Sequence, residues 1–309
     1  MAFNFPEQIQ VPNQFVKELG GVRVYLKRED LLHPEVSGNK FRKLKYNLLE
    51  ARKQKKEVLL TFGGAYSNHI AATAAAARLH NLGSIGVIRG EELGEDLEKT
   101  LRENPSLRFA ASCGMKFRFM SRARYREKGL AEVQEELREE FGDFYLLPEG
   151  GTNALAVKGC EEILAPADMD FDVICCSVGT GGTIAGIINS AGEGQKILGF
   201  PALKGDFLDG EIRKLTRKFN WELILDYHFG GYAKVDPALI GFLNSFKRET
   251  GIQLDPIYTG KMMYGLLDLV EKGGFKENTR ILAIHTGGLQ GIAGMNRILE
   301  KRKDPLIEL

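Results

Sequence analysis

The sequence predicts an α/β fold with two open, twisted, largely parallel sheets wrapped by helices. Apolar strand-like runs alternate with segments of helical periodicity along most of the chain. Short glycine-rich turns join the strands to the following helices, which is typical of parallel sheets. The alternation falls into two sets. We therefore expect a small domain at residues 51–151 and a large domain built from residues 1–50 and 152–309.

The individual elements follow from local pattern and from turn residues. Strands are expected at residues 22–26, 57–62, 84–88, 115–120, 144–147, 172–178, 196–200, 222–226 and 280–284. One helix is expected from Lys40 onward, and another follows the acidic region after residue 88. Further helices are expected at residues 67–80, 125–141 and 154–164. Five more are expected to start near Gly182, Leu208, Pro237, Lys261 and Leu289.

Composition excludes several classes of protein. The chain has 309 residues, enough for two domains, and is 43% apolar and 27% charged with a formal net charge of +1. Such a balance argues against a nucleic-acid partner. The sequence shows no signal-peptide pattern and no apolar run of membrane-spanning length, so we expect a cytoplasmic protein without membrane contact. Four cysteines without a Cys-X-X-Cys motif, and five histidines without ligand spacing, predict reduced thiols and no metal site.

The most informative segment is Ser37–Leu44. A small, turn-prone tripeptide precedes Lys40, which falls in the first turn of a helix whose apolar residues leave Arg42, Lys43 and Lys45 off the apolar face. A lysine held at such a junction is useful when burial or a neighbouring cation makes its amine nucleophilic. Taken alone, Lys40 would more often be a surface residue.

Four strand-to-helix turns are unusually rich in small and polar residues. In open parallel sheets, ligands bind at these turns, beyond the carboxyl ends of the strands. One such turn would mean little, but four predict a shared polar pocket. The turns are Gly63–His69, Gly150–Asn153, Gly179–Thr183 and His285–Gly288.

The turn Gly179–Thr183 predicts a phosphate site. Its small residues let several backbone amides and a helix N-terminus face one anion. It lacks the Gly-Lys-Ser/Thr of a nucleotide loop, and Ile184 occupies the third glycine position of the dinucleotide pattern. A small phosphorylated ligand therefore fits better than ATP or NAD. A tight connection without a ligand is the alternative.

Other polar residues are candidates for binding the rest of such a ligand. Ser67 and Asn68 begin an alanine-rich helix, where they either cap its N-terminus or grip a carboxylate together with His69. Tyr232 and Tyr258 follow turn residues and either pack structurally, flank a flat ring, or act as acid and base.

Taken together, these motifs resemble one family. The matching segments are Lys27–Asp30, Ser37–Leu44, Gly63–His69, Pro148–Gly151, Gly179–Thr183, Asp255–Lys261 and His285–Gly288. Their order is similar to that of the D-cysteine desulfhydrase and 1-aminocyclopropane-1-carboxylate deaminase family. That family belongs to the tryptophan synthase β-like, fold-type II pyridoxal-phosphate enzymes.

The resemblance implies a role for each motif. Pyridoxal 5'-phosphate would be held in the large domain, the substrate would be a small amino acid, and the enzyme would be a homodimer. The implied cofactor-binding residues are Lys40 (covalently), Asn68, Gly179, Thr180, Gly181, Gly182, Thr183, Tyr258, Thr286 and Gly287. The implied substrate-binding residues are Ser67, Asn68, His69 and Thr259, and the implied catalytic residues are Lys40, Ser67, Tyr232 and Tyr258.

Two positions favour one branch of the family. The resemblance implies that deaminases which open the cyclopropane carry Glu and an apolar residue where this chain has Thr259 and Thr286. Threonine at both positions favours α,β-elimination of D-cysteine to pyruvate, sulfide and ammonia, with Lys40 as the base and either tyrosine assisting the leaving group. The enzyme would be classed as a lyase or, because its product enamine hydrolyses, a hydrolase. The alternatives are 1-aminocyclopropane-1-carboxylate deaminase, a racemase or dehydratase, and a pyridoxal-phosphate-binding protein without turnover.

Overall fold

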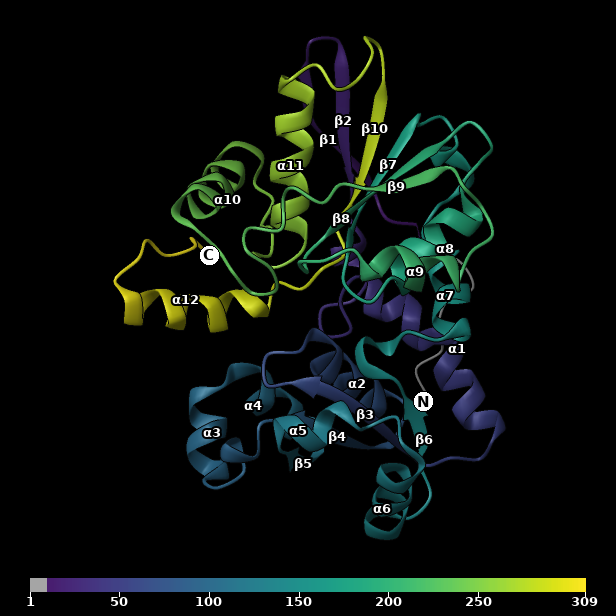
Figure 1. The fold of residues 1–309 in the computed structure, drawn as a ribbon, viewed down its shortest axis with the longest axis vertical. Coiled ribbons are helices and arrows are strands. Elements are labelled where there is room, and N and C mark those ends of the chain that lie inside the picture. Colours follow the sequence, from purple (N-terminus) through teal and green to yellow (C-terminus); the bar gives the residue numbers. More distant parts are fainter. Residues whose placement is uncertain (1–9) are drawn as a thin grey trace.

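The computed structural model describes residues 10–309, which form two sheets stacked one above the other (Figure 1). Within these residues the larger sheet has six strands in the order β1-β2-β10-β7-β8-β9. Only the β1–β2 pair in it is antiparallel. The strands are β1 (Asn13–Leu19), β2 (Val22–Lys27), β10 (Arg280–Ile284), β7 (Val173–Val178), β8 (Lys196–Pro201) and β9 (Trp221–Leu223).

Strand β10 joins the two ends of the chain in the larger sheet. Ile281 pairs with Val24 of β2 on one side and with Val173 of β7 on the other. The smaller sheet has the order β5-β4-β3-β6, and all its pairs are parallel. Its strands are β3 (Val58–Gly64), β4 (Gly83–Arg89), β5 (Lys116–Met120) and β6 (Tyr145–Leu147). The predicted α/β class with two largely parallel sheets is confirmed; the domain boundaries stay a prediction.

Helices cover both faces of each sheet. One face of the larger sheet packs against α10, α11 and α12, and the other against α7, α8 and α9. Helices α1, α2 and α4 cover one face of the smaller sheet, and α5 and α6 the other. The helices are α1 (Asn39–Lys53), α2 (Asn68–Leu79), α3 (Leu97–Glu103), α4 (Pro105–Ser112), α5 (Arg122–Arg126), α6 (Ala131–Phe141), α7 (Ala154–Cys160), α8 (Gly182–Ser190), α9 (Phe207–Arg213), α10 (Pro237–Thr250), α11 (Thr259–Glu271) and α12 (Gly291–Arg302).

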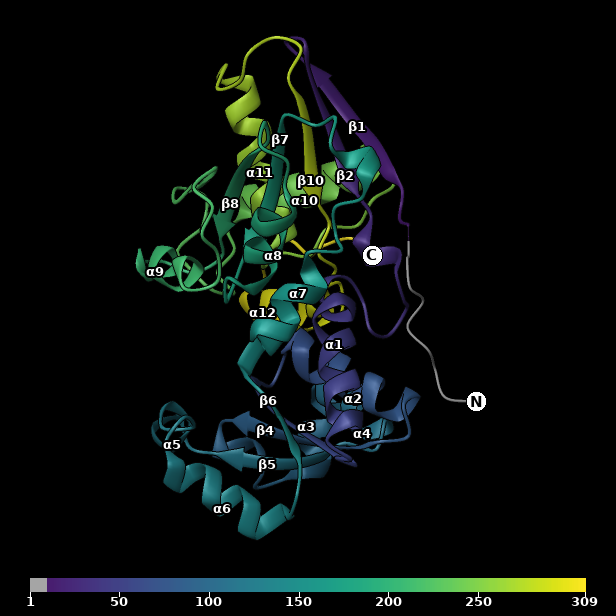
Figure 2. The ribbon, with the colours of Figure 1, turned by 90° about the vertical axis from the view of Figure 1, so that its right-hand side faces the viewer.

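Helices α1, α7 and α12 lie at the level between the two sheets in both views (Figures 1 and 2). The carboxyl ends of the parallel strands in both sheets carry the polar turns, and these turns meet beside the start of α1. Within residues 10–309, no helix is long and apolar enough to cross a lipid bilayer.

Several sequence predictions differ from the structure. The single helix expected after the acidic region that follows residue 88 is two helices, α3 and α4. The predicted helix over residues 125–141 is two helices, α5 and α6, because the chain turns at residues 127–130 around Gly129. Strand β1 was not predicted, since its sequence mixes polar and apolar residues without clean alternation. Its strand conformation depends on antiparallel pairing with β2 at the sheet edge.

Candidate active site

One cavity collects most of the residues that the sequence singled out. Of the predicted site residues, Gly182 and Thr259 lie outside its lining. The predicted residues that line it are Lys40, Ser67, Asn68, His69, Gly179, Thr180, Gly181, Thr183, Tyr232, Tyr258, Thr286 and Gly287. Other lining residues were not assigned a role from the sequence, among them Asn39, Lys43, Gly150 and Ser177.

The turn before Lys40 fits tightly against the turn that follows β10. Gly38 adopts a φ of 61°, and a Cβ there would lie 2.0 Å from the carbonyl oxygen of Thr286. The Asn39 amide donates to that same oxygen at 3.2 Å. Glycine is therefore required here for both conformation and space, and the close fit fixes where Lys40 starts.

The Lys40 amine is prepared for chemistry near neutral pH. Burial, followed by the positive charge of Lys43, lowers the pKa of Lys40 to about 7. Its Nζ donates to the side-chain oxygen of Asn39 at 3.2 Å, and the Asn39 amide nitrogen donates to Thr183 at 2.8 Å. The lysine is thus linked through Asn39 to the predicted phosphate loop.

Lys43 is a second buried amine in the same cavity. It is 2% exposed, and its Nζ donates to the Gly150 carbonyl at 3.0 Å and to the Thr152 hydroxyl at 2.9 Å. The Thr152 hydroxyl lies 2.5 Å from that of Thr180, in the predicted phosphate loop. Lys43 therefore places a cation beside that loop. The sequence signal was its i, i+3 spacing from Lys40 on one helix.

The loop Gly179–Thr183 has the form of an anion site. Gly181 is left-handed, with a φ of 83°, and α8 begins after it without a side-chain cap. The first backbone bond into the helix is from Ala185 to Gly181. The amides of Gly182, Thr183 and Ile184 therefore precede the intrahelical bonds and can receive a phosphate. Gly182 can contribute its amide although it does not line the cavity.

The N-terminus of α2 forms the opposite side. The Ser67 hydroxyl caps the helix by accepting from the Ile70 amide at 3.4 Å, as one of the sequence alternatives held. The side-chain oxygen of Asn68 is buried and has no hydrogen-bond partner among the described residues. The His69 ring lies 2.8 Å from the Thr61 hydroxyl, and burial lowers the pKa of His69 well below its usual value. His69 therefore meets a ligand as a neutral ring.

The turn Asp255–Thr259 is organised by one buried carboxylate. Asp255 accepts from the amides of Ile257, Tyr258 and Thr259 at 2.8–2.9 Å and from the Thr259 hydroxyl at 2.5 Å. Thr259 is fully buried and directs its hydroxyl to Asp255, not into the cavity. This placement gives no support to the direct substrate contact predicted for Thr259. Its visible effect is on the position of Tyr258.

Two tyrosines stand together over the cavity. Their ring centroids are 6.2 Å apart with the planes at 64°. Burial raises the pKa of Tyr258 well above its ordinary value. Burial also raises the pKa of Tyr232, but the Tyr258 hydroxyl and the charge of Arg89 oppose that rise. Tyr232 is therefore the better placed of the two to give up a proton.

A buried lysine fixes the segment before Tyr232. Lys261, 2% exposed, donates to the carbonyls of His228 and Gly231 at 2.8 Å each. Between them Phe229 and Gly230 both have positive φ. Such a turn needs external support, which the ammonium group of Lys261 supplies.

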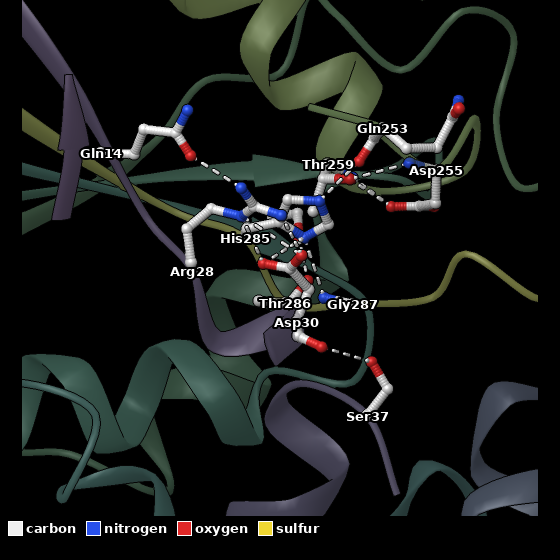
Figure 3. A network of polar contacts seen from close by, with 11 residues as sticks. Gln14, Arg28, Asp30, Ser37, Gln253, Asp255, Thr259, His285, Thr286 and Gly287 are labelled. Carbon is white, nitrogen blue, oxygen red and sulfur yellow. Dashed lines mark hydrogen bonds and ion pairs between the residues drawn. The ribbon is translucent and has the colours of Figure 1, made fainter. Parts of the chain in front are cut away.

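Figure 3 shows how the turn after β10 is held. His285 is fully buried; its Nε2 lies 2.8 Å from the Gln253 carbonyl, and its Nδ1 accepts from the Gly287 amide at 3.2 Å. The Asp30 carboxylate lies 3.8 Å from Nδ1 and is itself paired with Arg28 at 2.7 Å. The next residue, Thr286, places its hydroxyl 3.2 Å from that of Ser177.

These groups fit pyridoxal phosphate. A lysine with a lowered pKa can hold the aldehyde carbon, and the α8 N-terminus and Lys43 can hold a phosphate. The unpartnered side-chain oxygen of Asn68 can accept from a polar ring substituent. The neutral hydroxyls of Ser177 and Thr286 suit a pyridine nitrogen. Fold and site define a tryptophan synthase β-like enzyme that depends on pyridoxal phosphate.

Comparison with known proteins identifies the family. The model of the pyridoxal-phosphate dependent enzyme family matches residues 7–287. The chain is 33% identical to a putative 1-aminocyclopropane-1-carboxylate deaminase of Pyrococcus horikoshii, covering 91% of this chain and 90% of that one. It is 34% identical to a bifunctional D-cysteine desulfhydrase/1-aminocyclopropane-1-carboxylate deaminase of Arabidopsis thaliana, described as mitochondrial. That match covers 88% of this chain and 74% of the Arabidopsis protein. A crystal structure of a homologue of 1-aminocyclopropane-1-carboxylate deaminase superposes with a TM-score of 0.80 at 30% identity over 95% and 94% of the two chains.

The chain therefore belongs to the D-cysteine desulfhydrase and 1-aminocyclopropane-1-carboxylate deaminase family of pyridoxal-phosphate enzymes. The expected cofactor and the expectation of an enzyme are confirmed. The lyase classification is supported, and the hydrolase classification is corrected. The homodimer and the cytoplasmic location stay predictions.

Proposed function

We propose that this enzyme removes the β-substituent and the amino group of D-cysteine, releasing pyruvate, sulfide and ammonia. The observation that carries the proposal is the combination of Lys40, whose pKa is about 7, with two neutral hydroxyls, Ser177 and Thr286, across the cavity. When bound, pyridoxal phosphate supplies the electron sink that makes the α-proton of an amino acid acidic. The chain supplies binding, orientation and proton transfer.

Lys40 is the proposed base. An amine with a pKa of about 7 is largely neutral just above neutral pH, so its Nζ can accept the α-proton. Its position is fixed by the Gly38 turn and by Asn39.

The substrate carboxylate is proposed to bind at the N-terminus of α2. The amides of Asn68 and His69 precede the first bond of that helix, from Ala71 to Ser67, and are free to donate. The Ser67 hydroxyl, which already accepts from Ile70, can donate its own proton to the carboxylate. We propose that this carboxylate position turns the Cα–H bond toward Lys40.

Tyr232 is proposed to protonate the departing sulfur. Its pKa is held lower than that of Tyr258 by Arg89 and by the Tyr258 hydroxyl. Tyr258 is proposed to pack on the cofactor ring, since its ring also lies against the loop: a Cβ at Gly179 would be 3.1 Å from it. The enamine that leaves the site hydrolyses in water to pyruvate and ammonia.

The choice of D-cysteine over the cyclopropane amino acid depends on the polar groups around the pyridine nitrogen. A carboxylate there would keep the nitrogen protonated, while neutral hydroxyls do not. Thr286 and Ser177 are neutral, and the buried carboxylate of Asp255 is engaged by four donors. A less protonated ring suits loss of a β-leaving group better than ring opening.

1-Aminocyclopropane-1-carboxylate deamination is the second candidate, because relatives at 33% and 34% identity carry that name. The test is stereo-resolved turnover by the purified holoenzyme of D- and L-cysteine, D- and L-serine and the cyclopropane amino acid, scoring pyruvate, sulfide and 2-oxobutyrate. We expect the highest kcat/KM with D-cysteine. A higher kcat/KM for 2-oxobutyrate formation would overturn the proposal, and interconversion of enantiomers without elimination would indicate a racemase.

A further inference from the structure

A second hollow adjoins the site at the carboxyl edge of the smaller sheet. It is lined by Gly64 at the end of β3, by Arg89 at the end of β4, and by residues of α5, including Arg122 and Arg126. Gly64 and Arg89 are direct neighbours in the sheet. Helix α5 lies beside these strand ends in Figure 1. Ligands bind at such edges of parallel sheets.

The hollow has an excess of positive charge. Its lining carries four cations, Arg89, Arg122, Arg126 and Lys128, against two carboxylates. Both carboxylates are already paired, Glu92 with Arg122 at 2.5 Å and Glu149 with Lys128 at 3.1 Å. Across residues 10–309, neither Arg89 nor Arg126 is within ion-pair distance of a carboxylate. The hollow thus offers two guanidinium groups to an anion.

The hollow and the catalytic cavity are lined by consecutive residues of two short backbone segments. Ala65 lines the hollow while the next residue, Tyr66, lines the cavity. In the same way, Glu149 lines the hollow and the next residue, Gly150, lines the cavity. Tyr232 lines the catalytic cavity and lies close enough to Arg89, which lines the hollow, for that charge to act on the pKa of Tyr232. A group extending from the reacting carbon past Tyr232 would therefore meet Arg89.

We propose that this hollow is an outer subsite for an anionic group, a carboxylate or sulfonate, at the far end of the substrate's β-substituent. The inference rests on the proposed elimination and names a substrate class for it: D-cysteine thioethers with an acidic tail. In the reaction the Cα–H and Cβ–S bonds break and a Cα=Cβ bond forms. The sulfur leaves with the bonding pair as a thiolate that takes a proton, and water hydrolyses the enamine to pyruvate and ammonia.

The test compares two substrates that differ only in charge, S-(2-carboxyethyl)-D-cysteine and its amide S-(2-carbamoylethyl)-D-cysteine. Pyruvate release by the holoenzyme gives kcat/KM for each. We expect the carboxylate to be preferred about fivefold or more, as for one well-placed ion pair near a surface. In Arg89→Gln/Arg126→Gln the ratio should fall to about one. Because the ratio compares two substrates in the same preparation, loss of folded protein does not alter it.

A matched control removes two cations from α3, outside the hollow. Lys99 and Arg102 lie on that exposed helix, and the variant Lys99→Gln/Arg102→Gln should keep the wild-type ratio. The proposal is overturned by equal kcat/KM for acid and amide in the wild type, by a ratio that survives loss of both arginines, or by an enzyme that consumes D-cysteine but neither thioether. A ratio of one together with a sulfate effect on D-cysteine turnover at constant ionic strength would instead assign the hollow to a free anion.

Failure of the proposed elimination would look different. The enzyme would then release no pyruvate from D-cysteine or from either thioether. Dissociation constants for the two thioethers, read from the absorbance of the bound cofactor, would still give the acid-to-amide ratio. A ratio near one in binding would overturn the outer subsite, and a ratio lost only in Arg89→Gln/Arg126→Gln would support it without elimination.

Discussion

The backbone carbonyl of Thr286 accepts a hydrogen bond at 3.2 Å from the amide of Asn39, the residue before Lys40. This bond joins the turn after β10 to the start of α1, so the reactive lysine is placed by segments from both ends of the chain. Gly38 lies in the same contact, where a Cβ would be 2.0 Å from the Thr286 oxygen.

The first prediction concerns Gly38→Ala. The new Cβ collides with a backbone atom that cannot rotate away, and alanine also resists the φ of 61°. We expect a loss of about 3 kcal/mol or more in the free energy of unfolding, along with weaker cofactor binding. The matched control is Gly20→Ala, with a φ of 53° but no atom within 4 Å of its Cβ, which should cost only about 1 kcal/mol. If denaturant titrations gave equal losses of unfolding free energy for the two variants, the close contact of Gly38 with the Thr286 carbonyl would be contradicted.

The second prediction concerns pH. The neutral amine of Lys40 is the proposed proton acceptor, so kcat should rise with pH through about 7. The charge of Lys43 lowers the pKa of Lys40, so Lys43→Met should raise that pKa and move the rising limb to higher pH. Lys53→Met, on the exposed end of the same helix, should leave the limb in place. If the pH profile of Lys43→Met moved to lower pH instead, the charge of Lys43 would not be lowering the pKa of Lys40.

The third prediction separates the two threonines. Thr259→Val removes one of the donors to the buried Asp255 carboxylate and should destabilise the fold by about 1–3 kcal/mol. Thr286→Val should alter the absorbance of the bound cofactor and the preference between D-cysteine and the cyclopropane amino acid, because its hydroxyl lines the cavity. Substrate assays and unfolding curves on both variants decide this. A specificity change from Thr259→Val with unchanged stability would contradict the assignment.

The fourth prediction concerns Lys261. Lys261→Met removes both donors that hold the His228 and Gly231 carbonyls and should lower kcat roughly tenfold to a hundredfold by displacing Tyr232. Lys272→Met, an exposed lysine at the C-cap of the same helix, is the control and should retain wild-type kcat. In a Tyr232→Phe background the Lys261 change should cost little more, because both act on one group. If the losses in kcat from Lys261→Met and Tyr232→Phe were fully additive, Lys261 would act on something other than Tyr232.

The sequence predicts more of the fold than of the site. Strand–turn–helix alternation is local and repeated, so both sheets and most helices are predictable. The glycine turns mark the cavity because parallel strands bring their carboxyl ends to one edge. Strand β1 was missed because its conformation depends on its partner β2.

Side chains whose role depends on distant partners were harder to predict. Arg42, Lys43 and Lys45 lie off the apolar face of α1, where cations are usually solvated, yet all three are buried. Glu29 pairs with Arg42 and Glu162 with Lys45, and both carboxylates lie outside the helix. Ser177 lies within an apolar strand and was not predicted, and its hydroxyl lies 3.2 Å from that of Thr286.

The central claim is that Lys40 carries the cofactor, and the most direct test is borohydride reduction of the holoenzyme followed by peptide mapping. Burial lowers the pKa of Lys43 and Lys261 as well as that of Lys40. The amines of these two lysines could therefore compete with Lys40 for the cofactor. We expect the reduced pyridoxyl group on Lys40 alone, and a colourless Lys40→Ala variant. Modification of Lys43 or Lys261 in place of Lys40 would contradict the site as described.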